Sequence, residues 1–291
     1  MKRSQGEKVF NVFNILFLAG VGLVALYPFI YTLTISLSTA AEANRDSLHL
    51  YPREATLAAF RIVLTTPEVL TGYINTLLRT VVGTLLTLLM TCIAAYPLAM
   101  KELPHRGLII FLILFTMIFD GGIVPKYLLI KNLGLLNSLW ALILPMMLTA
   151  FNIIVVKNFF QQIPASLHEA ARIDGASEAA ILFRIYIPLS KPVLATVALW
   201  TAVVHWNQWF DAMLYITDDR KQVLQNFLQR IVIESSTQML DMGMTRTDIT
   251  QFTPETVKAA TVIITILPII CFYPFVQKYF VKGILLGSVK G

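Results

Sequence analysis

Charged residues and cysteines are scarce in this chain of 291 residues, and each shortage narrows the class of protein. Charged residues make up only 14% of the sequence, against roughly 25% in ordinary soluble domains. Hydrophobic residues make up 56%, and the mean hydropathy is +0.70. A soluble core does not need so much apolar surface, whereas helices that face lipid do. The composition therefore predicts an integral membrane protein.

The two cysteines and the net charge carry little functional information. Cys92 and Cys271 both fall inside apolar runs, so we expect two small buried hydrophobic residues. The net charge of +6 is spread along the chain, and no basic cluster is dense enough to bind nucleic acid. Internal repeats and low-complexity tracts are also missing. We therefore expect one membrane domain over residues 1–291.

Enzyme and ATP-binding signatures are missing as well. The sequence contains no G-x-S-x-G, no H-E-x-x-H and no pair of carboxylates at helical spacing within an apolar run. It contains no G-x-x-x-x-G-K-[ST], so it does not bind ATP phosphates through a P-loop. His205 has no second metal-ligand candidate nearby, which favours a polar contact over a metal site. We expect no catalytic residue, metal or cofactor on this chain.

Six apolar blocks are long enough to cross a bilayer, whose hydrocarbon core takes about 20 residues per helix. The first runs past that length without a convincing A-x-A site, so we expect an uncleaved span rather than a signal peptide. Asp120-Gly121-Gly122 with Pro125 breaks the third, either to line a cavity or as an outer turn. The blocks cover residues 10–35, 73–98, 107–131, 137–162, 190–216 and 257–281.

Lysine and arginine predict the orientation of these spans. With the N-terminus inside, the inner segments are short and basic, and the outer segments 36–72 and 217–256 are longer and hold most of the acids. We therefore expect cytoplasmic termini and a long outer loop at about 217–256. The basic residues of the inner segments are Lys2, Arg3, Lys8, Lys101, Arg106, Lys157, Arg172, Arg184, Lys191, Lys278, Lys282 and Lys290.

Residues 164–192 have the pattern of a short polar helical hairpin between two spans, on the cytoplasmic side of the predicted topology. Ser166 and Glu169 have the spacing of a capping box, which predicts a helix from about Leu167. Exposed amphipathic helices of this kind are typical of docking elements. Judged from amphipathicity alone, an ordinary interfacial loop fits equally well.

The second half of the hairpin follows from its turn and breaker residues. Asp174-Gly175 is expected to end the first helix, because glycine tolerates the left-handed conformation favoured after a helix C-terminus. Ser177 can cap a second short helix, and Pro188 is expected to stop it. Pro192 is expected in the first turn of the next span.

Three stretches of the sequence carry a resemblance to a known family. EAARIDGA at 169–176, followed by FRIYIPLSKP at 183–192, closely resembles the EAA motif of ABC importer permeases. GGIVPKYLLIKNLGLLNSLWALILP at 121–145 and HWNQWFDAMLYI at 205–216 resemble the polysaccharide-type branch of carbohydrate permeases. KGILLGSVKG at 282–291 resembles the tail of the smaller subunit in heterodimeric sugar importers. The similarity covers most of residues 73–291.

The resemblance implies an all-α protein of the bacterial cytoplasmic (inner) membrane with the type I importer permease fold. With a second permease subunit it would form the translocation path of an oligosaccharide importer, beside an extracytoplasmic sugar-binding protein. Two ATPase subunits would bind ATP and Mg, receive the hairpin's coupling helix in a cleft, and drive the switch between inward- and outward-open states. The residues that match the coupling motif are Glu169, Ala170, Ala171, Asp174, Gly175 and Ala176.

Polar and aromatic residues in two spans are candidates for the translocation path. Trp206, Asn207, Trp209 and Asp211 crowd the outer half of the fifth span, where they either line a path or form an interfacial aromatic belt. Arg79, a turn or two inside the second span, either faces an acidic sugar or extends to the lipid headgroups, and we favour the second.

Ala212 stands where sugar permeases have a proline, which leaves open whether the fifth span is kinked. An acidic oligosaccharide derived from pectin or alginate is one substrate hypothesis, which Arg79, Lys126 and Lys131 near the outer face support weakly.

Two other classes of protein are alternatives. An ion-coupled secondary transporter should show repeated halves and intramembrane acids, and neither is evident. A membrane-embedded glycan-modifying enzyme would need a catalytic acid or a metal cluster, which the sequence does not display.

Overall fold

The computed structural model describes residues 5–45, 47–233 and 253–288, with side chains up to residue 271. Lys2, Arg3, Lys290 and the middle of the predicted outer loop lie outside the described residues. Among the residues described, every element is a helix, apart from a single bridge between Ser38 and Ala55. The predicted all-α architecture is therefore confirmed.

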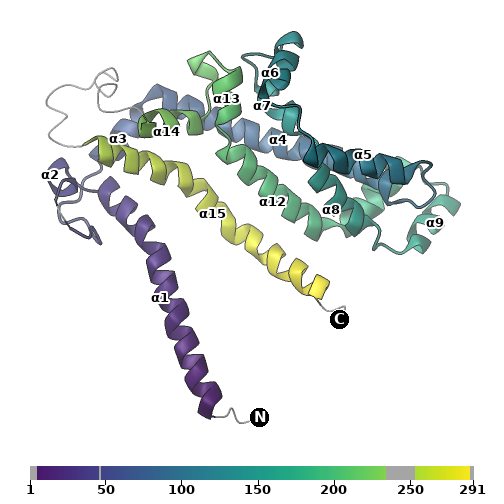
Figure 1. Ribbon diagram of the computed structural model, residues 1–291, viewed down its shortest axis with the longest axis horizontal. Coiled ribbons are helices and arrows are strands. Elements are labelled where there is room, and N and C mark those ends of the chain that lie inside the picture. Colours follow the sequence, from purple (N-terminus) through teal and green to yellow (C-terminus); the bar gives the residue numbers. More distant parts are fainter. Residues whose placement is uncertain (1–4, 46, 234–252, 289–291) are drawn as a thin grey trace. The chain divides into compact units, whose positions relative to one another are not determined.

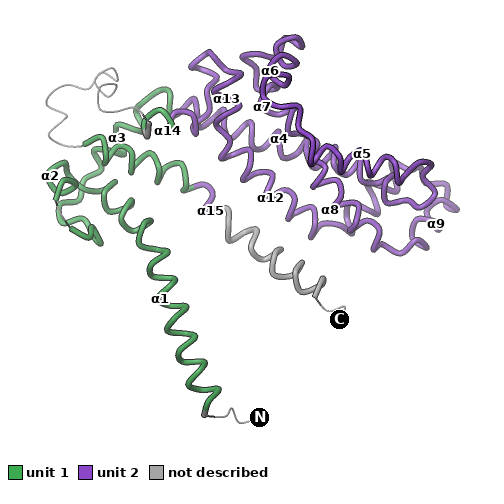
Figure 2. The backbone as a smooth tube through the Cα atoms, in the orientation of Figure 1, with its two compact units in different colours: residues 1–69, 228–267 green, residues 70–227, 268–291 purple. Residues whose placement is uncertain are grey.

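The chain groups into two compact units, which Figure 2 distinguishes by colour. The first comprises residues 1–69 and 228–267, and the second comprises residues 70–227 and 268–291. The expectation of a single membrane domain stays a prediction. The first unit holds α1 (Gln5–Ser36), α2 (Ala40–Ala43), α3 (Ala58–Thr65), the end of α14 (Leu224–Ile233) and the first part of α15 (Pro254–Ser288).

The second unit is built on α4 (Pro67–Ala99), a helix of 33 residues (Figure 1). The remaining elements of this unit are α5 (Arg106–Ile118), α6 (Ile123–Asn132), α7 (Leu139–Ile143), a 3-10 turn (Leu144–Met146), α8 (Ala150–Phe160), α9 (Ala165–Ile173), α10 (Glu178–Ile181), a π-helical turn (Leu182–Tyr186), α11 (Ile187–Leu189), α12 (Lys191–Asn207), α13 (Phe210–Tyr215) and a 3-10 turn (Asp219–Lys221).

Three described helices are long and apolar enough to cross a membrane, at 6–36, 67–99 and 254–271. Three further segments pass the same test only as bent pairs: α5 with α6 (110°), α7 and its 3-10 turn with α8 (51°), and the helices of 178–189 with α12 (83°). The described helices therefore provide up to six spans, and half of these are bent.

The third predicted block does not continue as one straight helix. α5 ends at Ile118 and α6 starts at Ile123, at the predicted Asp120-Gly121-Gly122 break. Gly122 has φ +82°, a conformation that residues with a Cβ rarely adopt, and its N–H donates to Asp120 Oδ1 at 2.7 Å. This turn redirects the chain by 110° after only 13 residues of α5.

The fifth predicted block is broken as well. α12 ends at Asn207 and α13 begins at Phe210, so the break falls on Gln208 and Trp209. Ala212 lies inside α13. The helix is therefore interrupted directly after the Trp206-Asn207 pair, without a proline at position 212.

Between Gly72 and Thr91, the buried face of α4 is made of small and polar residues. A Cβ built at Gly72 would lie 3.1 Å from the backbone nitrogen of Leu224, and one built at Gly83 would lie 2.6 Å from His205 Nε2. Thr76 Oγ1 accepts the N–H of Leu224, at the start of α14, at 2.9 Å. Small residues let membrane helices approach closely, and they fix how α4 packs against its neighbours in this unit.

We expect Gly83→Ala to destabilise the protein, because the added Cβ would overlap the imidazole of His205, which is only 1% exposed. Overpacking of this kind costs about 1–3 kcal/mol. The midpoint of thermal unfolding in detergent should fall, and His205→Ala in the same chain should restore part of it. Gly107→Ala is the matched control, because nothing lies within 4 Å of a Cβ there. An unchanged midpoint in Gly83→Ala would contradict this packing.

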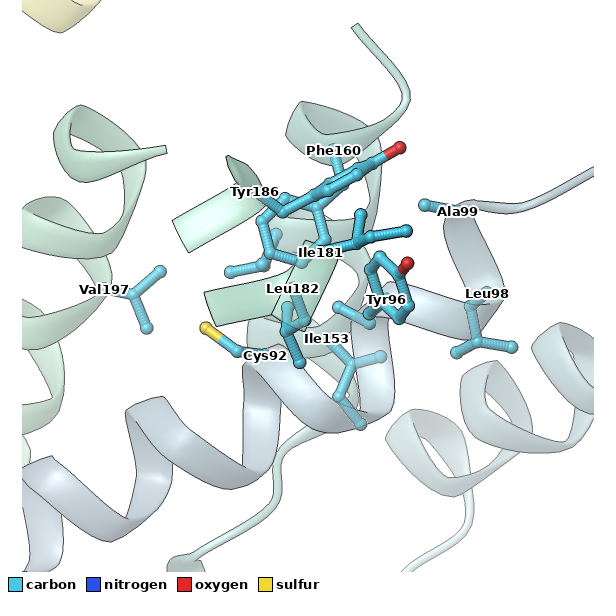
Figure 3. Close-up of a cluster of buried hydrophobic side chains, with 12 residues drawn as sticks. Cys92, Tyr96, Leu98, Ala99, Ile153, Phe160, Ile181, Leu182, Tyr186 and Val197 are labelled. Carbon is cyan, nitrogen blue, oxygen red and sulfur yellow. The ribbon is translucent and has the colours of Figure 1, made fainter. Parts of the chain in front are cut away.

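An apolar core at the end of α4 joins four parts of the second unit (Figure 3). It packs the hairpin's second arm against α4, α8 and α12, so the hairpin is continuous with the membrane helices. Its buried members are Cys92, Ala95, Tyr96, Leu98 and Ala99 of α4, Ile153, Val156 and Phe160 of α8, Ile181, Leu182 and Tyr186 of the hairpin, and Val197 of α12.

The two cysteines differ in burial. Cys92 is buried in this core, as predicted. Cys271 is exposed, so the prediction of a buried thiol is wrong there. Lipid is as apolar as a leucine side chain, and an apolar run that crosses a membrane therefore need not be buried within its own chain.

Candidate functional site

The first arm of the hairpin, α9, starts directly after Pro164. Pro164 has the extended conformation of a helix N-cap (φ −56°, ψ 129°), and its carbonyl accepts the N–H of Leu167 at 3.1 Å. The predicted capping box is wrong, because Ser166 lies inside the first turn and no side chain caps the helix. The fixed φ of proline already sets the helix start, so a hydroxyl cap is not needed.

The turn between the two arms has the geometry predicted for Asp174-Gly175. α9 ends at Ile173, and Gly175 has φ +78°. The N–H of Gly175 donates to Arg172 O at 3.0 Å, and the N–H of Ala176 donates to Ala171 O at 2.9 Å. These two bonds form a Schellman motif, which satisfies the last carbonyls of α9 and fixes the direction of the second arm.

The second arm begins as predicted but ends differently. Ser177 Oγ accepts the N–H of Ala180 at 3.3 Å, which confirms the predicted cap. Pro188 does not stop the arm, which runs through the π-helical turn into α11 and ends at Leu189. Pro188 lies in the first turn of α11, where its missing N–H does not interrupt the helix. Pro192 lies in the first turn of α12, as predicted.

The six residues of the coupling motif divide between two faces of the hairpin. Ala171 and Ala176 are half-buried and pack against the core. The other four residues, Glu169, Ala170, Asp174 and Gly175, are exposed. The hairpin is therefore seated on the membrane helices by its inner face, while its outer face is free in this chain to meet another protein.

Ile173 is 86% exposed on this otherwise polar outer face. Such an apolar side chain, beside Glu169 and Asp174, gives the hairpin an anchor suited to a groove in another protein. Ile173 was not among the predicted coupling residues. The pattern alone does not reveal that the side chain points away from the core.

A small polar cluster links the hairpin to α4. Tyr96 Oη donates to Glu178 Oε2 at 2.6 Å and lies 3.5 Å from His168 Nδ1. Glu178 Oε1 lies 4.0 Å from His168 Nε2 and 3.8 Å from Arg172 Nε. Tyr96 is only 7% exposed, so its hydroxyl reaches from the core to the carboxylate at the surface.

Arg79 lies 17 residues before Tyr96 on α4 and is fully buried. Its guanidinium forms an ion pair with Asp211, Nη1 lying 3.2 Å from Oδ1 and Nη2 bonding Oδ2. Nη1 also donates to Gln208 O at 2.9 Å, and Nη2 donates to Leu142 O at 3.3 Å. The expectation that Arg79 extends to the lipid headgroups is wrong, because the partners for its charge lie inside the protein.

The Arg79–Asp211 pair hydrogen-bonds to backbone groups at the break in the fifth span. Gln208 lies in that break, and Ala212, in the first turn of α13, donates its N–H to Asp211 Oδ1 at 2.7 Å. Irregular backbone at membrane depth needs such partners, because no water is present to satisfy it. Arg79 therefore connects α4, the end of α7 and the start of α13.

The other candidate path residues differ in how far they are exposed. Trp206 is 5% exposed, and its ring meets that of Tyr73 edge-on at 5.7 Å. Trp209 is half-buried beside Phe210, with ring centroids 5.7 Å apart. Asn207 is exposed, and its Nδ2 donates to Val203 O at 2.9 Å. Of this group, Asn207 is the side chain most accessible to a solute.

His205 is buried, and its Nδ1 has no hydrogen-bond partner in the described part of the chain. The predicted polar contact is therefore not found at this nitrogen, and the imidazole packs over Gly83 instead. Within the described ranges, no group of three or more His, Cys, Asp or Glu side chains could hold a metal ion.

The hairpin and the contacts of Asn75 lie near opposite ends of α4, and the Arg79–Asp211 pair lies between them. Asn75 Nδ2 donates to Arg220 O at 3.0 Å and to Gln222 O at 2.9 Å near the start of α4, whereas Tyr96 contacts the hairpin near its end. These two positions are 21 residues apart on one helix, or about 31 Å at a rise of about 1.5 Å per residue. That distance is about the thickness of the hydrocarbon core.

Helices long and apolar enough to cross a membrane, with a partly exposed polar hairpin between two of them, are typical of transporter permease subunits. The family model for the binding-protein-dependent transport system inner membrane component matches residues 68–285, and the chain belongs to this family. The chain is thus an inner membrane component of an ABC transporter, a transport subunit rather than an enzyme. This family membership decides against the two alternative classes, an ion-coupled secondary transporter and a membrane-embedded glycan-modifying enzyme.

Similar proteins span almost the whole chain. Protein LplC of Bacillus subtilis (strain 168) is 46% identical over 294 residues, covering 100% of this chain and 98% of its own length. The polygalacturonan/rhamnogalacturonan transport system permease protein YtcP of the same organism is 39% identical, covering 98% of this chain and 99% of its own.

A solved structure has the same fold. It is described as a bacterial ABC transporter involved in the import of the acidic polysaccharide alginate, and one of its chains superposes with a TM-score of 0.90 at 35% identity. The match covers 96% of this chain and 99% of the other. The predicted type I importer permease fold is therefore confirmed.

Proposed function

We propose that this chain is one of two permease subunits of an ATP-driven importer that carries acidic oligosaccharides across the cytoplasmic membrane of a bacterium. The observation that carries the proposal is the hairpin, whose inner face packs into the membrane core and whose outer face is exposed. A chain without a P-loop needs such a surface to receive energy from an ATPase.

The partners follow from this role. Two ATPase subunits bind ATP and Mg, and one of them receives the exposed hairpin residues Glu169, Ala170, Asp174 and Gly175. A second permease subunit completes the translocation path, which Asn207, Trp206, Trp209, Asp211 and Arg79 border at the outer half of the fifth span. An extracytoplasmic binding protein delivers the sugar, and both termini lie in the cytoplasm.

The substrate class is supported mainly by similar proteins, because of the three basic residues predicted near the outer face only Lys131, which is exposed, is without an ion pair among the described residues. The permease YtcP and the alginate importer, both matched over nearly the whole chain, are named for acidic polysaccharides. Arg79 is paired with Asp211, and Lys126 Nζ lies 2.5 Å from Asp120 Oδ2. In this proposal the binding protein and the second permease subunit therefore provide most of the selectivity for acidic sugars.

The test is ATP hydrolysis by the purified complex with its binding protein, measured against neutral and acidic oligosaccharides. Stimulation is expected from galacturonate- or mannuronate-containing oligomers and not from neutral arabino- or galacto-oligosaccharides. Stimulation by neutral oligomers alone would contradict the substrate class. If no ATPase co-purifies with this chain, the proposed function itself is contradicted.

A further inference from the structure

The hairpin must transmit force to the membrane helices, and apolar packing alone does so loosely. Tyr186 meets Tyr96 edge-on with ring centroids 5.0 Å apart, and it meets Phe160 in the same way at 5.4 Å. Figure 3 shows Tyr96 and Tyr186 side by side in the apolar core. Such contacts resist separation and favour certain ring geometries, but they hold the orientation of the hairpin less firmly than a hydrogen bond to a charged group does.

Directional contacts between α4 and the hairpin come from one side chain in the described part of the chain. The Tyr96 hydroxyl donates to Glu178 at 2.6 Å, a short bond to an ionised acceptor, and such bonds are about twice as strong as neutral ones. The same oxygen lies 3.5 Å from His168 Nδ1, which can donate to it in the appropriate tautomer. His168 belongs to α9 and Glu178 to α10, so Tyr96 reaches both arms.

Other charged contacts of Glu178 add little to this link. Arg172 Nε is 3.8 Å away, and the Arg172 and Glu178 side chains are 65% and 56% exposed. Ion pairs between exposed side chains contribute little to stability. They also lie within the hairpin and do not connect it to α4. The Tyr96 hydroxyl is therefore the group that links the hairpin to α4 by hydrogen bonds in the described part of the chain.

We propose that Tyr96 is a positioning residue for energy coupling, because its hydroxyl ties both arms of the hairpin to α4 through Glu178 and His168. The inference rests on the proposed function, in which an ATPase moves the hairpin. When the hairpin moves, these hydrogen bonds make α4 move with it. Without the hydroxyl, the hairpin still docks and ATP is still hydrolysed, but less of its motion reaches the membrane helices.

The test compares Tyr96→Phe with wild type in the complete importer, reconstituted in proteoliposomes with its binding protein. Tyr96→Phe keeps the ring in the core and removes only the hydroxyl. The number of oligosaccharides transported per ATP hydrolysed should fall about tenfold, the factor expected when one hydrogen bond to a charged group is lost. The rate of ATP hydrolysis should stay close to that of wild type.

Tyr186→Phe is the matched control. Tyr186 is 3% exposed in the same cluster and touches the same rings, but its hydroxyl makes no hydrogen bond within the described residues. Its transport per ATP should equal that of wild type. An equal loss in both variants would mean that packing, not the Tyr96 hydroxyl, is responsible, and would overturn the inference.

Changes at the acceptor give an independent readout. Glu178→Gln keeps a side-chain oxygen for the Tyr96 hydroxyl and should retain most of the coupling, whereas Glu178→Met should behave like Tyr96→Phe. Adding Glu178→Met to Tyr96→Phe should cause little further loss, because both changes remove the same bond. If Glu178→Gln and Glu178→Met transported the same number of oligosaccharides per ATP hydrolysed, the inference would be overturned, even if Tyr96→Phe failed to assemble.

Failure of this inference is distinguishable from failure of the proposed function. If the wild-type complex shows no ATP-driven uptake, the proposed function is wrong. If wild type transports and Tyr96→Phe transports equally well per ATP, the proposed function stands and the role of Tyr96 is wrong.

Discussion

Gly175→Pro abolishes transport while leaving the chain inserted in the membrane, if the hairpin couples ATP hydrolysis to transport. Gly175 has φ +78°, whereas proline is fixed near −65°. The change also removes the N–H that donates to Arg172 O. The Schellman motif would open, and the second arm would leave α9 in a different direction. Uptake by the reconstituted importer should fall to background, while the amount of chain in the membrane fraction stays that of wild type.

Gly175→Asn is the matched control for this experiment. Asparagine tolerates the left-handed conformation better than other residues with a Cβ, and it keeps the N–H. A Cβ at position 175 would meet nothing within 4 Å. Gly175→Asn should therefore retain most of the transport. Substantial uptake by Gly175→Pro would refute the assignment of this turn to coupling.

Arg79→Met is expected to cause a large loss of folded protein, because it leaves the Asp211 carboxylate without its cation. Only 14% of the Asp211 side chain is exposed, so the carboxylate cannot recover the lost interaction from water. Breaking a buried pair from one side costs about 3–5 kcal/mol. The yield of assembled complex and its midpoint of thermal unfolding in detergent should both fall.

The double variant Arg79→Met with Asp211→Leu separates a structural pair from a sugar-binding arginine. Replacing both partners by apolar residues removes the unpaired charge, so the double variant should be more stable than Arg79→Met. The double variant should regain only part of the lost stability, because Leu142 O and Gln208 O also lose their hydrogen-bond donor. If Arg79→Met instead assembles normally and loses only the transport of acidic sugars, Arg79 binds the substrate and the pair is not structural.

Local sequence patterns predicted the turn features of the hairpin. The left-handed Gly175, the cap at Ser177 and the proline in the first turn of α12 depend on neighbouring residues alone. The all-α class followed in the same way from composition and from runs of apolar residues. The break at Asp120-Gly121-Gly122 was also predicted, although its 110° angle was not.

Long-range pairing was beyond what one sequence can provide. Arg79 and Asp211 are 132 positions apart, and Tyr96 and Glu178 are 82 apart. Without spatial information, an arginine near the end of a span is indistinguishable from one that reaches the headgroups. A tyrosine in an apolar run likewise gives no sign that its hydroxyl meets a carboxylate on another element.

Helices in the polar segments were missed for a different reason. α3 and α14 lie in segments that we interpreted as outer loops, because neither is long enough or apolar enough to register as a span. α14 starts where Thr76 Oγ1 accepts the N–H of Leu224, a tertiary contact across 148 positions. The predicted capping box failed through competition with Pro164, whose backbone sets an earlier start for α9.

The measurement that tests the account most directly is uptake of a labelled acidic oligosaccharide by proteoliposomes that hold the complete importer. ATP is supplied on the side of the hairpin and binding protein on the other, with ion gradients collapsed. We expect uptake that requires ATP and binding protein, persists without any gradient and is lost in Gly175→Pro. Uptake that follows an ion gradient and continues without ATP would contradict it.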